Sequence, residues 1–169
     1  MREILLLWVG RRGEAELERV ATEYRRRIER HVAVAEVRIR PEPGRAGDPV
    51  RARAQEGERM REHLRPTDLL FALDEHGTER TTLELAEVLR TQLARGRVVF
   101  LLGSDLGLDP RLVAAGESLA LSRLTLSHQL ARVVLLEQLY RCFDLLAGGA
   151  YHRGELPTPG YNVPRRRRR

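Results

Sequence analysis

The sequence predicts an α/β domain with three layers and a mostly parallel sheet. Short apolar runs alternate with longer segments of helical periodicity, in the order β α β α β α β α β α, which is typical of such domains. The runs ILLLWV and VVFLL have no polar interruption, as expected for strands that are buried on both faces. A loop with two glycines directly follows the second run, at the position where open parallel sheets bind ligands.

Two strands and one helix are predicted in the first part of the chain. Residues 4–9 form a buried strand that ends at Gly10, and residues 14–30 form a helix with apolar side chains three and four positions apart. Residues 32–39 alternate between apolar and polar side chains, as in an edge strand. Residues 40–49 are rich in Pro and Gly and form a loop.

The middle of the chain predicts two further helices around a third strand. Residues 50–64 form an exposed helix with many charges. Residues 68–73 form the strand, and residues 74–77 form a loop after it. Thr81 and Glu84 then have the spacing of a capping box, which opens a helix that continues to Ala94.

After the strand at residues 97–102 the chain predicts a candidate binding crevice. The loop at residues 103–107 leads to Asp109 and Pro110, a helix cap followed by an N1 proline. Residues 118–121 form another short strand, and residues 122–127 form a second loop. Both loops follow strands of the predicted parallel sheet, so both are expected at the carboxyl edge where ligands bind.

The last predicted helix, at residues 128–147, is apolar around most of its circumference. Its polar side chains are confined to a narrow stripe of Glu137, Arg141 and Asp144. A surface helix needs only one apolar face. The surplus favours a homodimer, although a helix through the middle of its own domain would also explain it.

Length and composition favour one domain, residues 1–153, followed by a tail at residues 154–169 that we expect to be disordered. No apolar run approaches the roughly 20 residues of a membrane span, and the N-terminus leads directly into a strand, so a cytoplasmic protein without a signal peptide is expected. The single Cys142 excludes an internal disulfide and offers no zinc spacing, and we interpret it as a core residue.

The positive charge is unevenly distributed and consists only of arginine. Residues 1–65 hold 16 arginines against 12 acidic residues, residues 66–164 hold 9 against 12, and residues 165–169 add five more arginines. Arginine binds phosphate with two parallel hydrogen bonds, so a polyanionic partner is plausible. The arginines within residues 14–30 fit either a phosphate-binding patch or a solvated helix face.

Several kinds of chemistry are not supported by the motifs. The sequence has neither a phosphate loop for nucleoside triphosphates nor the glycine fingerprint of dinucleotide-binding sheets. Ser104 does not lie in a nucleophile elbow, because the spacing of its neighbouring glycines is wrong. The five histidines are scattered without metal-ligand spacing, so we expect no metal. Of these histidines, His76 and His128 fall near the crevice and are either functional or solvated.

Six segments of the chain form a combination that is specific although each is weak alone: ILLLWVG, TEYRRRI, FALDEHG, LLGSDLGLDP, LSRLTLSHQLARVVLLEQLYR and YHR. In this combination the chain resembles the RlmH family of SPOUT methyltransferases. Members of that family methylate N3 of a pseudouridine in helix 69 of 23S rRNA. The resemblance implies a C-terminal trefoil knot, a homodimer, and S-adenosyl-L-methionine held in the knotted loops. The family loop usually reads GGPEG, whereas Ser104, Asp105 and Leu106 occupy its middle here.

The resemblance also implies which residues form the site. The methyl donor is expected at three segments, comprising Leu73, then Gly103, Ser104 and Gly107, then Ser122, Arg123, Leu124, Thr125, Leu126 and Ser127. His152 and Arg153 belong to the C-terminal YHR motif and are the expected catalytic residues. Arg153 has a fixed charge for an RNA phosphate or a developing negative oxygen, and the imidazole of His152 can accept a proton as a base. Both residues could also serve only to contact RNA.

Two other functions remain open from the sequence. One is a noncatalytic RNA-binding or ribosome-binding protein that keeps the fold, and retained affinity for the methyl donor would distinguish the two. The other is an oxidoreductase that uses a dinucleotide, which ranks last because the phosphate-binding loop is absent. The arginine tail extends beyond the usual end of the family and either binds rRNA or is solvated.

Overall fold

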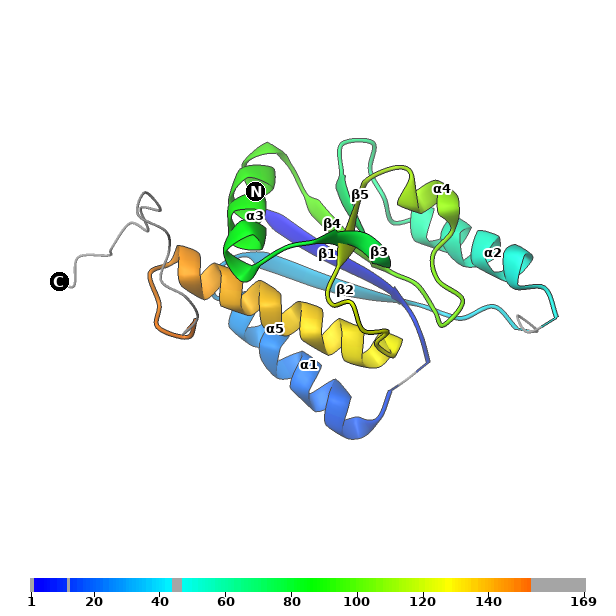
Figure 1. Ribbon diagram of the computed structural model, residues 1–169, viewed down its shortest axis with the longest axis horizontal. Helices are drawn as coiled ribbons and strands as arrows, with labels where there is room; N and C mark the ends of the chain where they lie inside the picture. Colours follow the sequence, from blue (N-terminus) through cyan, green and yellow to red (C-terminus); the bar gives the residue numbers. More distant parts are fainter. Residues whose placement is uncertain (1, 12, 44–46, 153–169) are drawn as a thin grey trace.

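The computed structural model describes residues 2–11, 13–43 and 47–152. Strands and helices alternate along this part of the chain, which confirms the predicted order of elements (Figure 1). The strands are β1 (Glu3–Val9), β2 (Ala33–Ile39), β3 (Leu69–Glu79), β4 (Val98–Leu102) and β5 (Glu117–Ala120). The helices are α1 (Ala15–Ile28), α2 (Pro49–Arg61), α3 (Thr82–Arg95), α4 (Pro110–Val113) and α5 (His128–Leu146).

The strands form one sheet in the order β2-β1-β4-β3-β5, and every neighbouring pair is parallel. The two uninterrupted apolar runs are β1 and β4, which lie side by side with Ile4 opposite Val98 and Leu6 opposite Phe100. All five residues of β4 are buried. The alternating segment is β2, at one edge of the sheet, as its pattern predicted.

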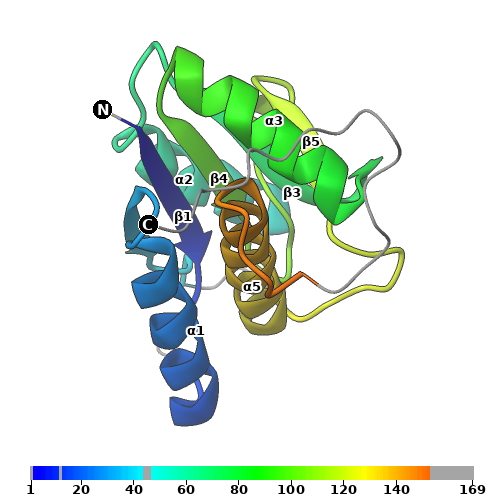
Figure 2. The ribbon, with the colours of Figure 1, turned by 90° about the vertical axis from the view of Figure 1, so that its left-hand side faces the viewer.

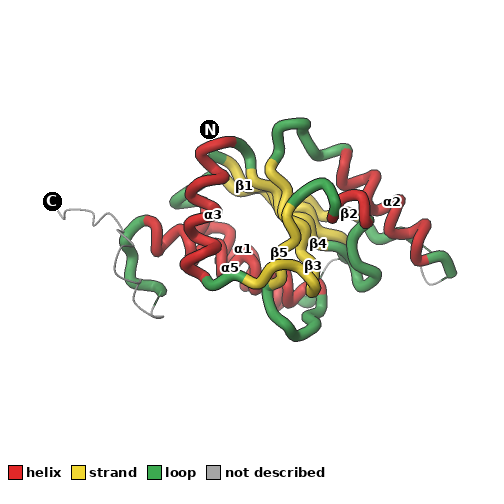
Figure 3. The backbone as a smooth tube through the Cα atoms, turned by 45° about the horizontal axis from the view of Figure 1, so that its top comes forward, coloured by secondary structure: helices red, strands yellow, loops and turns green. Residues whose placement is uncertain are grey.

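Helices cover both faces of the sheet, which confirms the three layers. On one face α1, α3 and α5 pack against Ile4, Leu6 and Phe100. On the other face α2 and α4 contribute Met60 and Leu112 to a smaller core. Figure 2 shows α1, α3 and α5 as one layer, and Figure 3 shows the sheet between that layer and α2.

Three helices begin at side-chain caps that the sequence indicates. Thr81 and Glu84 complete the predicted capping box of α3. Asp109 accepts a hydrogen bond from the Arg111 amide at the start of α4, and Ser127 accepts one from the Leu130 amide at the start of α5. These caps satisfy amides that would otherwise lack partners, and so they fix where each loop ends.

One prediction about the sheet was wrong. The segment 74–77 is not a loop after β3, because β3 continues to Glu79. The pairing of β3 with β5 shifts register between Leu73 and Thr78, and this irregularity absorbs the polar segment into the strand. Gly77 permits the close approach, since a Cβ there would lie 2.8 Å from the backbone N of Leu119.

The long apolar helix α5 lies between α1 and α3 and is largely buried within its own chain (Figure 2). Its surplus of apolar side chains is therefore accounted for by neighbouring helices as well as by the sheet. Cys142 is buried in this helix, as interpreted, and burial raises the pKa of its thiol to about 12. Within residues 2–152, apart from the gaps given above, no helix is long and apolar enough to span a membrane.

Candidate functional site

The segment after β4 is a tight turn, which we call the glycine loop (residues 103–107). The Gly107 amide donates to the Ser104 carbonyl at 2.9 Å, and the Leu106 amide donates to the Ser104 hydroxyl at 3.4 Å. Gly107 has a φ of 82°, a left-handed conformation that favours glycine. A Cβ on Gly103 would lie 2.5 Å from the carbonyl carbon of Gly107. Both glycines are therefore required by the shape of this turn.

The segment between β5 and α5, the serine loop (residues 122–127), is connected to the extended part of β3. The Thr125 hydroxyl donates to Glu75 Oε2 at 2.7 Å, and Arg123 lies 4.0 Å from Glu79. Within the loop, the Leu124 amide donates to the Ser122 hydroxyl at 3.0 Å. The Leu124 side chain is 74% exposed, which leaves a large apolar group without a partner at this edge.

The glycine loop, the serine loop and Leu73 meet at the carboxyl edge of the sheet. Ala72 lies opposite Leu101, so Leu73 and Gly103 follow at nearly the same level of neighbouring strands. Leu73 also lies opposite Leu119 of β5, and the serine loop begins shortly after that strand. The strand register thus places Leu73 between the glycine loop and the beginning of the serine loop, the three segments that the family resemblance implies for the methyl donor.

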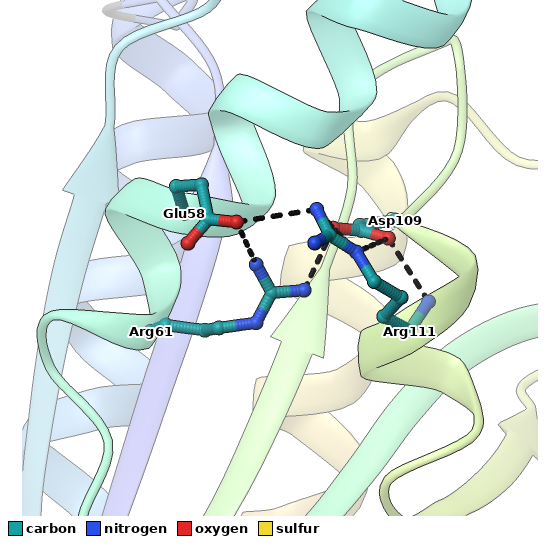
Figure 4. A network of polar contacts seen from close by, with 4 residues as sticks. All are labelled: Glu58, Arg61, Asp109 and Arg111. Carbon is teal, nitrogen blue, oxygen red and sulfur yellow. Dashed lines mark hydrogen bonds and ion pairs between the residues drawn. The ribbon is translucent and has the colours of Figure 1, made fainter.

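Asp109 ends the segment that contains the glycine loop, and a network of charged side chains holds it in place (Figure 4). Asp109 is only 3% exposed and accepts hydrogen bonds from Arg61 at 2.7 Å and from Arg111 at 3.0 Å. Glu58 also forms ion pairs with both of these arginines. Burial raises the pKa of Asp109, but the hydrogen bonds from Arg111 and Arg61 outweigh it and leave that pKa below its usual range.

The beginning of the glycine loop is held by a buried glutamate that the sequence analysis did not identify. Glu56 of α2 is 2% exposed and accepts a hydrogen bond from the Ser104 hydroxyl at 3.0 Å. Its other oxygen accepts one from the Glu42 amide at 2.9 Å. The many charges in residues 50–64 predicted an exposed helix. The periodicity of this segment did not indicate that one of its carboxylates is buried.

The C-terminal motif lies elsewhere on the chain. The Tyr151 amide donates to Asp144 at 2.9 Å, and its hydroxyl lies 3.2 Å from both Tyr24 and Glu137. His152 follows, and its buried Nδ1 has no hydrogen-bond partner among the described residues. Arg153, the other predicted catalytic residue, lies outside the described residues.

Within a single chain, His152 does not lie beside the crevice. The serine loop ends at the beginning of α5, whereas Tyr151 is bound near the other end of that helix, at Asp144 (Figure 1). Asp144 follows Ser127 by 17 positions, which corresponds to about 25 Å of helical rise. The predicted donor site and the predicted catalytic motif are therefore separated within one chain.

Comparison with known proteins identifies the class of this fold and site. Residues 2–152 match the family model described as predicted SPOUT methyltransferase. The chain is 37% identical over 159 residues to a protein of Pelotomaculum thermopropionicum named ribosomal RNA large subunit methyltransferase H, with 90% of this chain and 99% of the relative covered. A relative of the same name from Geotalea daltonii is 39% identical over 150 residues, with 87% and 97% covered.

A solved structure supports the fold. The probable methylase family protein from Haemophilus influenzae Rd KW20 superposes with a TM-score of 0.54 at 13% identity, covering 93% of this chain and 72% of that one. At this identity the likeness concerns the fold alone. With the family match and the relatives, the conclusion is plain: the chain belongs to the SPOUT methyltransferase family.

The residues at the carboxyl edge fit S-adenosyl-L-methionine, the methyl donor of this family. Leu73, Leu124 and Leu126 offer apolar surface for an adenine ring, and the backbone of both loops offers donors and acceptors. Two carboxylates at this edge, Glu75 and Glu79, suit a ligand that carries positive charge. Among the described residues no group of three or more His, Cys, Asp and Glu side chains is placed to hold a metal ion.

Proposed function

We propose that the chain transfers a methyl group to N3 of a pseudouridine in helix 69 of 23S rRNA. The observation that carries the proposal is its identity of 36–39% to relatives named ribosomal RNA large subunit methyltransferase H, over about nine tenths of the chain. The bound donor supplies an electrophilic methyl group at the carboxyl edge of the sheet. Leu73, the glycine loop and the serine loop hold it there. We also propose that the protein works in the cytoplasm and that its chain forms the trefoil knot of the family.

The reaction requires that the proton on N3 leaves before or as the methyl group arrives. We assign its removal to His152, because a neutral imidazole nitrogen can accept a proton. Its Nδ1 has no partner in the described part of the chain, so nothing there locks the ring into one tautomer. Arg153 is proposed to neutralise the charge that develops on the uracil oxygen, or to hold a neighbouring phosphate.

The separation of His152 from the donor loops supports a homodimer with shared sites. If each chain supplies the donor site and its partner supplies His152, the distance along α5 ceases to be an obstacle. Two apolar side chains on the outer surfaces of α1 and α5 remain exposed, Val20 at 36% and Leu130 at 44%. They are candidates for burial between two copies.

Arginines of α1 are candidates for contacts with the RNA backbone. Arg25 and Arg27 form ion pairs with neighbouring glutamates. Arg19, Arg26 and Arg30 form no ion pair with a described residue, which leaves their charges available to phosphates. The arginines of the tail belong to the same proposal, but residues 153–169 lie outside the described part of the chain.

Transfer of a labelled methyl group distinguishes this proposal from that of a noncatalytic RNA binder. The protein is incubated with labelled S-adenosyl-L-methionine and large ribosomal subunits that lack the modification. We expect label in 23S rRNA, and none with subunits that already carry it. Binding of the subunit without transfer of label would support the noncatalytic alternative instead.

A further inference from the structure

Glu56 is a buried carboxylate whose hydrogen-bond partners in the described part of the chain are both neutral. Its oxygens accept hydrogen bonds from the Ser104 hydroxyl at 3.0 Å and from the Glu42 amide at 2.9 Å, and no described arginine forms an ion pair with it. Burial of a charged group is costly unless it is well hydrogen-bonded. The two hydrogen bonds partly offset that cost, and they fix the position of Ser104 relative to α2.

The residue after Glu56 touches the other end of the same segment. A Cβ on Gly57 would lie 2.6 Å from both Cβ and Oδ2 of Asp109, so α2 approaches Asp109 as closely as its backbone allows. One turn later, Arg61 donates to Asp109 at 2.7 Å (Figure 4). Helix α2 therefore holds both ends of the segment from Ser104 to Asp109.

Ser104 transmits the position of α2 to the glycine loop. Its hydroxyl donates to Glu56 and also accepts from the Leu106 amide at 3.4 Å. Its carbonyl accepts from the Gly107 amide at 2.9 Å. Ser104 thus joins the buried carboxylate to the turn, and loss of its hydroxyl would release the beginning of the turn from α2 while the contact of Arg61 with Asp109 still holds its end.

We infer that Glu56 is a positioning residue for the methyl donor, acting through Ser104 on the glycine loop. The inference rests on the proposed function, because it requires that the glycine loop binds the donor. A turn already held in the binding conformation loses less conformational freedom when the ligand arrives. The Ser104–Glu56 hydrogen bond should therefore strengthen donor binding beyond its contribution to stability.

Calorimetry with S-adenosyl-L-methionine and the full chain tests the inference. Ser104→Ala and Glu56→Ala should each weaken binding about tenfold, the effect of losing one hydrogen bond to a charged group. The double variant should bind no more weakly than the weaker single variant, because both changes break the same connection. Glu56→Gln should bind within about threefold of the parent, because its amide can donate to Ser104 and its oxygen can accept from Glu42.

Asp68→Ala is the matched control. Asp68 is another buried carboxylate, whose side chain is 1% exposed and bonded to Arg97 at the amino end of the sheet, away from both loops. Its loss should lower the melting temperature without changing donor affinity. If Ser104→Ala and Glu56→Ala bind the donor as tightly as the parent does, the inference is wrong but the proposed function stands. The same holds if Asp68→Ala weakens donor binding as much as these two variants do. A parent that does not bind the donor would overturn the proposed function, and the inference with it.

Discussion

The guanidinium group of Arg132 in α5 lies 4.3 Å from the ring centre of Trp8 in β1. The same group bonds to Glu36 at 2.7 Å and to Glu18 at 3.0 Å. These contacts join α5, just after the serine loop, to β1, β2 and α1. Because Arg132 is only 7% exposed, its charge depends on these partners and not on water.

Replacement of Arg132 should therefore be strongly destabilising. Arg132→Met keeps much of the apolar stem but leaves the largely buried Glu36 with only its longer contact to Arg25, at 3.8 Å, and we expect the free energy of unfolding to fall by about 3 kcal/mol. Urea unfolding measures this change. Addition of Glu36→Gln to Arg132→Met should recover part of the loss, because the more deeply buried of the two carboxylates then carries no charge, whereas Glu18 is partly exposed to water. A loss below about 1 kcal/mol in the single variant would show that the cluster is not a stabilising brace.

The buried aspartates Asp68 and Asp109 should make stability sensitive to acid. Burial raises the pKa of Asp68, but hydrogen bonds from Arg97 and the Arg65 amide outweigh it, so its pKa is lowered, as is that of Asp109. A carboxyl group with a lowered pKa stabilises the fold above its unfolded pKa of about 3.9, and this contribution is lost as the pH falls towards the folded value.

Unfolding free energies measured from pH 7 to pH 2 test this expectation. They should fall below about pH 4 in the parent. Asp68→Asn and Asp109→Asn should each be less stable at neutral pH and show a shallower decline in acid. An unchanged decline in both variants would assign acid sensitivity to other carboxyl groups.

The sequence predicted the order of the elements, the buried strands and the edge strand, because these follow from local periodicity. It also placed the capping box of α3 and the beginning of α5. It did not predict that β3 passes Leu73, because that depends on the shifted register with β5 and on the approach at Gly77. The two loops proposed to bind the donor could be named from the family resemblance, but their contacts with Glu75 and Glu56 could not.

Arg132 shows a different limit of sequence analysis. The polar stripe predicted for α5 contained Glu137, Arg141 and Asp144 and omitted Arg132, which is buried with partners more than 90 residues away. Helical periodicity describes one helix at a time, so it does not reveal which arginine finds a buried glutamate on another element. The same reason explains why Glu56 was missed.

Shared sites can be tested with a purified heterodimer. One chain carries His152→Ala, which should lower methyl transfer at least about a hundredfold in the homodimer. The other carries Gly103→Val, whose side chain would meet the backbone of Gly107 and distort the glycine loop. In the heterodimer one of the two sites is intact, so about half of the parent activity should return. A chain with both substitutions, paired with His152→Ala, is the control and should stay inactive.

The opposite results are equally clear. If each chain has a complete site, the heterodimer should remain as inactive as the two homodimers. If His152→Ala alone transfers methyl groups within about threefold of the parent rate at saturating RNA, His152 is not the base. A chain that sediments as a 19.3 kDa monomer at all micromolar concentrations would exclude shared sites altogether.

The methylated atom itself is what distinguishes this enzyme from other rRNA methyltransferases. Mass spectrometry of the helix 69 fragment, isolated from 23S rRNA after incubation with the protein and S-adenosyl-L-methionine, locates the methyl group directly. We expect one added methyl group, on N3 of a pseudouridine, and none when the same fragment contains uridine at that position. A methyl group on a ribose oxygen or on another base, or no methyl group although the donor binds, would contradict this expectation.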